Sequence, residues 1–184
     1  MKVVWEKQWL LKLLLLLLRL KKQTSSLGWT TMSSKFGIVG MGGVGKTTLA
    51  KKAYEIIEND MHFQCFSWVH VSQSSLDDKY ILKCMLEGFH KSVRDQTPPS
   101  DGEVTMLNEE ELRKSISSCL QGKRYALVLD DVWDIHVWEY VKPCFPSEGG
   151  GRIILPTCDE ERASPVSERC HVHRLKPLPD GLAW

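Results

Sequence analysis

The feature that most constrains this chain is a glycine-rich segment of eight residues, from Gly40 to Thr47 (GMGGVGKT), which matches the pattern G-x-x-x-x-G-K-[ST] in full. Glycines in such a loop let the backbone curl until successive N–H groups point inward, where they can bind phosphate oxygens. A helix that follows the loop adds the positive end of its dipole. The segment therefore predicts a phosphate-binding loop made by Gly40, Gly42, Gly43, Val44, Gly45, Lys46, Thr47 and Thr48.

The three residues after the last glycine of the loop have expected roles in nucleotide binding. Lys46 is expected to reach the β- and γ-phosphates, the Thr47 hydroxyl to ligate Mg²⁺, and Thr48 to lie near the α-phosphate. A chance match to the pattern is the alternative. It is disfavoured because the apolar run Phe36–Val39 precedes the loop and apolar residues at helical spacing follow Lys46. A strand before the loop and a helix after it are the context that phosphate binding requires.

Two aspartates directly follow Tyr125–Leu129 (YALVL), a segment that is almost entirely apolar. In P-loop proteins an aspartate at the end of such a strand holds Mg²⁺, usually through water, and we assign this role to Asp130. Asp131 is a candidate for orienting or deprotonating an attacking water, which is a general-base role. Aspartates also commonly end a strand and open a turn. We prefer the metal-binding interpretation because a P-loop with only Lys46 on the phosphates and Thr47 on the ion would hold the cation incompletely.

Strand and helix patterns alternate along the chain. Helical spacing of apolar residues predicts helices that begin at Lys46 and that cover 76–89 and 108–120. Strands that alternate with helices form right-handed βαβ units. We therefore expect an α/β fold, a three-layer P-loop NTPase sandwich with a mainly parallel sheet of about five strands. The predicted strands are Phe36–Val39, Phe63–Ser72, Tyr125–Leu129, Arg152–Leu155 and His171–Leu175.

Local signals mark several helix ends. Asn108 and Glu111 have the spacing of a capping box, which predicts a helix N-terminus. Gly88 and Gly122 are interpreted as glycines at helix ends. Trp138 is expected to pack against the sheet rather than stack on a base.

Composition is that of a soluble globular protein, with 42% hydrophobic and 26% charged residues. The net charge of +1 gives no general attraction to nucleic acid or to an acidic membrane surface. The six cysteines are widely spaced and contain no C-x-x-C pair, so we expect buried, reduced thiols and a cytoplasmic protein.

The first 35 residues are interpreted as a leucine-rich leader and a linker, and residues 36–184 as the nucleotide-binding domain. The unbroken run Leu13–Leu18 is shorter than the roughly 20 residues that a membrane-spanning helix needs. A secretory signal peptide is disfavoured because Lys12 interrupts the apolar stretch and no clear cleavage site follows. A leucine-rich helix that packs on a partner, or a poorly specified leader, remains open.

Four motifs together resemble one family. The segments GMGGVGKTTLA, FSWVHVSQ, LVLDDVW and GRIILPT occur in the order seen in the NB-ARC domain of plant disease-resistance proteins. Trp133, which closes LDDVW, and the WVHVSQ segment are similar to the coiled-coil class of these receptors rather than the TIR class. The resemblance covers Phe36 to Trp184. It implies ADP/ATP and Mg²⁺ as ligands, and a switch that ADP keeps closed and ATP opens for defence signalling.

The sequence departs from that family in three places. Where T-T-R usually follows the fourth strand, with the arginine sensing the γ-phosphate, this chain has Pro156, Thr157 and Cys158. Cys158 brings no charge and Pro156 lacks a backbone donor, so the resemblance implies weaker discrimination of ATP from ADP. The chain ends at Trp184, before the subdomains that carry the G-L-P-L and M-H-D motifs, and the segment before Phe36 does not match the usual coiled-coil domain. We expect a truncated domain with an incomplete cover over the base.

Three functions are compatible with the sequence. The first is an ADP/ATP-binding module that acts as a signalling switch; the second is a Mg²⁺-dependent ATPase with true turnover; the third is a non-binding fragment of an incomplete gene. Hydrolysis is expected to be weak at most, because no evident group in the chain neutralises charge on the γ-phosphate. Expected partners are other resistance-protein domains or a second copy of the chain, with no nucleic acid and no transmembrane segment.

Overall fold

The structure, a computed structural model, describes the following parts of the chain: 34–59, 62–71, 78–93, 104, 106–132, 135–146, 150–157 and 170–175. The leucine run at 13–18, Trp133 and Cys158 lie outside the described residues. Within the described residues, no helix has both the length and the apolar character that crossing a bilayer requires.

Strands and helices alternate, and the strands form one sheet. The strands are β1 (Ser34–Val39), β2 (Cys65–His70), β3 (Tyr125–Asp130), β4 (Arg152–Thr157) and β5 (Cys170–Arg174). The helices of the described residues are α2 (Lys46–Asn59), α3 (Asp78–Ser92), α5 (Glu109–Leu120) and α6 (Ile135–Val141), which the short 3-10 helix η1 (Lys142–Cys144) follows. The predicted α/β fold with a parallel sheet of about five strands is confirmed.

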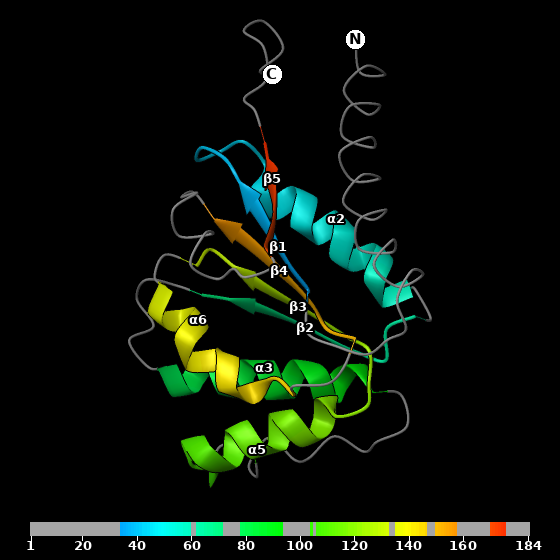
Figure 1. Cartoon of the computed structure of the whole chain (residues 1–184), viewed down its shortest axis with the longest axis vertical. Coiled ribbons are helices and arrows are strands. Elements are labelled where there is room, and N and C mark those ends of the chain that lie inside the picture. Colours follow the sequence, from blue (N-terminus) through cyan, green and yellow to red (C-terminus); the bar gives the residue numbers. More distant parts are fainter. Residues whose placement is uncertain are drawn as a thin grey trace, which may run out of the picture.

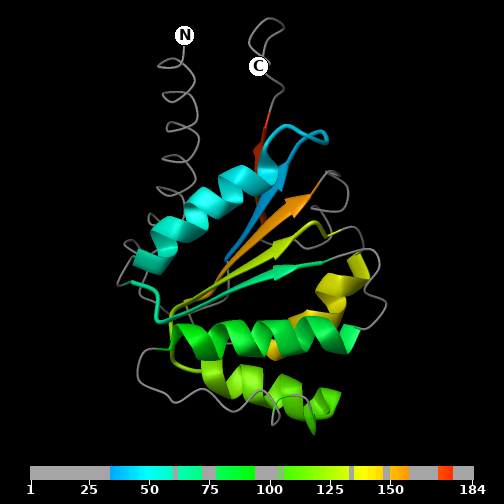
Figure 2. The ribbon, with the colours of Figure 1, turned by 180° about the vertical axis from the view of Figure 1, so that it is seen from behind.

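The strand order is β2-β3-β4-β1-β5, and every neighbouring pair is parallel. Parallel strands require crossover connections, which place helices on the faces of the sheet. Helix α2 lies over one face, and α3, α5 and α6 lie on the opposite side (Figures 1 and 2). Because all strands run in the same direction, their C-terminal ends gather at one edge of the sheet.

Strand β3 is buried along its whole length and contributes to both halves of the core. Ala126 and Val128 belong to the cluster beneath α2. Tyr125, Leu127 and Leu129 belong to the cluster beneath α3, α5 and α6. Successive side chains of a strand point to opposite faces, so a strand that is covered on both faces needs an unbroken apolar run. This requirement explains the YALVL segment.

The N-terminus of α5 has the predicted capping box. The Asn108 side-chain oxygen accepts a hydrogen bond from the Glu111 backbone N–H at 3.0 Å, and the Glu111 carboxylate accepts one from the Asn108 N–H at 2.8 Å. At the other end of this helix, Gly122 has a φ of 70°, the left-handed conformation that glycine adopts without strain. Both boundaries follow from the local sequence.

Several strand and helix boundaries differ from the prediction by one to three residues, and one helix was not predicted at all. Strand β1 begins at Ser34 instead of Phe36, and β2 begins at Cys65 instead of Phe63. The helix α6 was not predicted from the sequence. Its seven residues, Ile135–Val141, make only two turns, which is too short for a helical periodicity to stand out.

The prediction for Gly88 is wrong, because this glycine lies inside α3 rather than at its end. Its role is the close packing of α3 on β2. A Cβ atom added at Gly88 would overlap the Ser67 Oγ and lie 2.8 Å from the Ser67 Cβ. Ser67 is fully buried and its backbone belongs to the sheet, so neither partner can move away easily. The sequence pattern does not reveal this contact because the two residues belong to different elements.

Replacing Gly88 with alanine should therefore destabilise the fold. Overpacking of this kind costs about 1–3 kcal/mol, and the better helix propensity of alanine offsets about 1 kcal/mol of that cost. We expect Gly88→Ala to lower the free energy of unfolding by about 1 kcal/mol in urea titrations. In a double-mutant cycle, Ser67→Gly should relieve part of the loss. A Gly88→Ala chain as stable as the wild type would contradict the tight contact.

Candidate functional site

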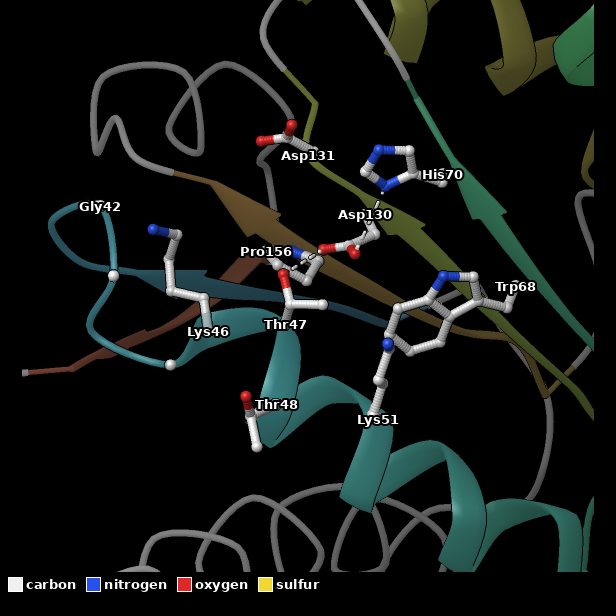
Figure 3. Close-up of a pocket in the computed structure, with 12 residues that line it drawn as sticks. Gly42, Lys46, Thr47, Thr48, Lys51, Trp68, His70, Asp130, Asp131 and Pro156 are labelled. Atoms are coloured by element: carbon white, nitrogen blue, oxygen red, sulfur yellow. Dashed lines mark hydrogen bonds and ion pairs between the residues drawn. The ribbon is translucent and has the colours of Figure 1, made fainter.

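A cleft of about 660 Å³ opens at the edge of the sheet where the strands end. Figure 3 shows the glycine loop on one side of this cleft and the ends of β2 and β3 on the other. Its walls come from the loop, α2, β2, β3 and β4, and consist of Gly42, Gly43, Gly45, Lys46, Thr47, Thr48, Lys51, Trp68, His70, Asp130, Asp131 and Pro156.

The glycine loop is curled, as its sequence predicts. Gly43 and Gly45 have φ angles of 74° and 93°, which side-chain-bearing residues rarely adopt. The Val44 N–H donates to the Met41 carbonyl at 3.3 Å and closes the turn. Gly40 packs behind the loop, where an added Cβ would lie 2.8 Å from the Leu175 carbonyl oxygen. Gly40 and Val44 therefore support the loop from behind, while its other glycines face the cleft.

The Lys46 amine lies over the glycine loop. Its Nζ donates hydrogen bonds to the carbonyl oxygens of Gly40 at 2.9 Å and Met41 at 3.0 Å. Lys46 is also the first residue of α2, so its side chain reaches back from the helix across the loop (Figure 3). Thr48 lies in the same first turn, is exposed, and lines the cleft. The lysine that the motif assigns to phosphate binding is thus at the mouth of the loop.

Thr47 and Asp130, which are 83 positions apart in the sequence, meet across the cleft. The Thr47 hydroxyl donates to the Asp130 Oδ1 at 3.0 Å, and Asp130 is only 3% exposed. This contact joins the first turn of α2 to the end of β3. Hydroxyl and carboxylate oxygens are the ligands that Mg²⁺ prefers, and Mg²⁺ is commonly held by one or two protein groups together with substrate phosphates. The pair therefore fits Mg²⁺ as part of a phosphate site.

A protein-family model described as the NB-ARC domain matches residues 20–184. The chain belongs to the NB-ARC family. This match confirms the resemblance that the four ordered motifs indicated.

Curated relatives of this NB-ARC chain are plant disease resistance proteins. Disease resistance protein RPP8 of Arabidopsis thaliana is 31% identical over 147 residues, which cover 80% of this chain and 15% of that protein. Disease resistance protein RPM1 of the same plant is 33% identical over 150 residues, which cover 80% of this chain and 16% of that protein. The chain thus spans about 15% of the length of the curated relatives it matches.

Solved structures share the fold of this NB-ARC chain at low sequence identity. A structure titled as Drosophila ORC bound to poly(dA/dT) DNA and Cdc6 superposes with a TM-score of 0.60 at 10% identity, covering 96% of this chain and 30% of that chain. Cdc6p from Pyrobaculum aerophilum superposes with a TM-score of 0.54 at 15% identity, covering 94% of this chain and 45% of that chain. At these identities the likeness concerns the fold alone.

Asp131 is the one non-glycine residue of the described chain with a positive φ, 63°. It is half-buried and lines the cleft. In Figure 3 its carboxylate points away from Thr47, whereas the Asp130 carboxylate points toward it. The left-handed backbone turns the chain immediately after β3, and aspartate tolerates this conformation better than most residues. The carboxylates of these two adjacent aspartates therefore point in different directions, only that of Asp130 toward Thr47.

Four residues that line the cleft of this NB-ARC chain were not predicted as site residues: Lys51, Trp68, His70 and Pro156. Lys51 lies one turn after Thr47 on α2, so its helical spacing could have identified it. Trp68 and His70 lie two positions apart on β2. Their place in the site depends on β2 being the neighbour of β3. No local sequence signal specifies that neighbour.

An aromatic cluster holds β2 against α2 beside the cleft. The Tyr54 ring makes edge-to-face contacts with Phe66, at 5.8 Å between ring centroids, and with Trp68, at 5.5 Å. Burial, together with the nearby Glu58 carboxylate, raises the pKa of the Tyr54 hydroxyl well above its usual value. Tyr54 therefore stays neutral and serves packing, which fixes the position of Trp68 at the wall of the cleft.

The backbone at Asp131 gives a test that separates conformation from chemistry. A left-handed residue with a side chain costs about 1–2 kcal/mol relative to the right-handed form, and glycine avoids this cost. We expect Asp131→Gly to unfold at a higher free energy than Asp131→Ala, by about 1 kcal/mol, in urea titrations. Asp131→Asn should be close to the wild type. Equal stability of the glycine and alanine variants would contradict the left-handed conformation.

Proposed function

We propose that this NB-ARC chain binds ADP and ATP together with Mg²⁺ and acts as the nucleotide-gated module of a plant disease-resistance protein. The observation that carries the proposal is the hydrogen bond between Thr47 and Asp130, at 3.0 Å, beside the curled glycine loop. This bond joins two residues that lie 83 positions apart in the sequence, the proposed cation-binding pair, beside the loop that we propose binds phosphate.

The phosphates would bind to the loop backbone and to the N-terminus of α2. Gly43 and Gly45 curl the loop, and α2, with 14 residues, adds a helix dipole directly behind it. The Lys46 amine would exchange its bonds to the Gly40 and Met41 carbonyls for bonds to the β- and γ-phosphates. Each of these groups binds phosphate charge and none recognises the base.

Thr47 would ligate Mg²⁺ directly, and Asp130 would hold it through water. When bound, Mg²⁺ neutralises charge on the β- and γ-phosphates. The Asp130 carboxylate is nearly buried, so it is oriented before the ligand arrives. The chain itself would thus supply one direct oxygen ligand, from Thr47, and one carboxylate that holds a metal-bound water, and the remaining ligands would come from phosphate and water.

The adenine preference and the switch role rest on the family. The chain belongs to the NB-ARC family, and the relatives it matches are named as disease resistance proteins. We infer that the chain corresponds to the ADP/ATP-controlled part of such a protein in innate immunity, located in the cytoplasm. Its partners would be other domains of resistance proteins or a second copy of the chain.

Hydrolysis would be slow. Asp131 lines the cleft and is the candidate general base. Beyond positioning of water, phosphoryl transfer also needs a group that neutralises charge on the γ-phosphate, often an arginine. At the end of β4 the sequence offers Pro156 and Cys158 instead of an arginine. Binding without rapid turnover is therefore the function that we propose.

Removing the Lys46 amine should weaken nucleotide binding. Hydrogen bonds that involve a charged group contribute about 1.5–3 kcal/mol, so Lys46→Ala should lower the affinity for labelled ADP or ATP by about 10- to 100-fold. The measurement is an equilibrium titration of the purified chain with Mg²⁺ present. Lys52→Ala is the matched control, because Lys52 lies on the same helix, pairs with Glu55 and does not line the cleft. Equal affinities of the wild type and Lys46→Ala would contradict the proposed site.

Phosphate release distinguishes a switch from an enzyme. We expect steady-state release from ATP on the order of 10⁻³ s⁻¹ or slower, the scale of P-loop proteins to which no arginine is supplied. Asp131→Asn should lower this rate further while nucleotide binding stays unchanged. Turnover that is much faster in the wild type, and lost in Lys46→Ala, would favour a true ATPase instead.

A further inference from the structure

The residue opposite Asp130 on the neighbouring strand is a histidine. His70 ends β2 and pairs with Asp130 in the parallel register. The pairing of β3 with β4 is shorter in the structure and ends at Val128 and Ile154. At Asp130, strand β3 is therefore still paired with β2 but no longer with β4. The residue paired with Asp130 is His70.

The two oxygens of the Asp130 carboxylate face different elements. Oδ1 accepts the hydrogen bond from the Thr47 hydroxyl on α2, and Oδ2 lies 3.6 Å from the His70 Nδ1 on β2 (Figure 3). The Asp130 backbone is also fixed, because its carbonyl accepts a hydrogen bond from the Val71 N–H at 2.8 Å. With the backbone fixed, rotation of the carboxylate is limited by Thr47 on one side and His70 on the other.

Exposure separates the two partners sharply. The Asp130 side chain is 4% exposed, and the His70 side chain is 61% exposed. A nearly buried carboxylate depends on the few polar groups that reach it. The 3.6 Å between the His70 Nδ1 and the Asp130 Oδ2 is beyond hydrogen-bond distance, so His70 acts on the carboxylate as a polar neighbour that limits its rotation. Truncating an exposed imidazole leaves no cavity, so the effect of His70 on the carboxylate can be tested without unfolding the chain.

We propose that His70 is the positioning residue of the Asp130 carboxylate and thereby sets how tightly the nucleotide-bound chain holds Mg²⁺. This inference rests on the proposed nucleotide function. Groups that orient a metal-binding side chain matter because they aim its lone pairs at the ion or at its water. Thr47 is itself a proposed Mg²⁺ ligand, so of the two side chains beside the carboxylate His70 is the one to which no direct role on the ion is assigned.

The test is the Mg²⁺ dependence of nucleotide binding. Fluorescently labelled ADP is titrated into the full 184-residue chain at increasing Mg²⁺, and again with the divalent ions removed by chelation. Loss of an orienting partner typically costs about 10- to 100-fold in metal affinity, and we expect His70→Ala to raise the half-effective Mg²⁺ concentration by about tenfold. Binding of ADP without Mg²⁺ should stay unchanged. That split is a readout that a purely structural role would not produce.

Two further variants serve as controls. His70→Asn keeps an amide nitrogen as many bonds from the backbone as the imidazole Nδ1, so it should restore most of the Mg²⁺ dependence. His62→Ala makes the same chemical change at an exposed histidine before β2 that does not line the cleft, and it should behave as the wild type.

The outcomes separate the two proposals. Wild-type Mg²⁺ dependence in His70→Ala overturns the positioning role, and so does a loss of binding that is equal with and without Mg²⁺. In both cases a wild-type chain that binds Mg²⁺ and ADP leaves the proposed function standing. A wild-type chain that binds no nucleotide overturns the proposed function and the role of His70 with it.

Discussion

The parallel pairing of β3 between β2 and β4 is the constraint on which the site depends. A strand buried on both faces must be apolar throughout, and its first polar residue therefore comes where it leaves the sheet. In β3 that residue is Asp130, which is why a carboxylate lies at the C-terminal edge and is nearly buried there. The same direction of β1 brings the glycine loop to this edge. The cleft follows from the direction of the strands.

The polar groups of the cleft are arranged around the nearly buried carboxylate of Asp130. Thr47 and His70 approach its two oxygens from a helix and from a strand, respectively. Lys46 lies at the loop on the far side of Thr47 (Figure 3). A buried carboxylate is costly without polar partners, and a cation shared with phosphate would supply a further one. The electrostatics of the cleft are therefore suited to a ligand that brings negative charge together with a divalent ion.

The parts of this architecture that depend on local patterns could be predicted from the sequence. The glycine loop, the strand before it, the helix after it and the capping box at Asn108 all have signals within a few residues. Asp130 was recognised because it directly follows an apolar strand. These features are set by backbone conformation and burial over short stretches, which a sequence expresses directly.

The parts that depend on which elements become neighbours could not be predicted. His70 and Trp68 belong to the cleft because β2 lies beside β3, and Gly88 is a glycine because α3 packs closely on Ser67. The helix α6 is short, and its aromatic residues fit a strand as well as a helix. Such features depend on packing between segments that are distant in the chain, and no short stretch of the sequence indicates which segments will pack together.

The bonds from the Lys46 amine to the Gly40 and Met41 carbonyls have a consequence for how the loop would respond to a ligand. The lysine braces the loop from within, so the curled shape does not have to be formed anew when an anion arrives. The same bonds compete with that anion, because both must break before the Lys46 amine can turn toward the cleft. In the proposed binding, the gain in free energy would be the difference between the amine's bonds to the anion and its bonds to the two carbonyls, which would lower the affinity and favour release. If the cleft binds anions as proposed, a loop held in this way would keep its shape while one bound anion replaces another.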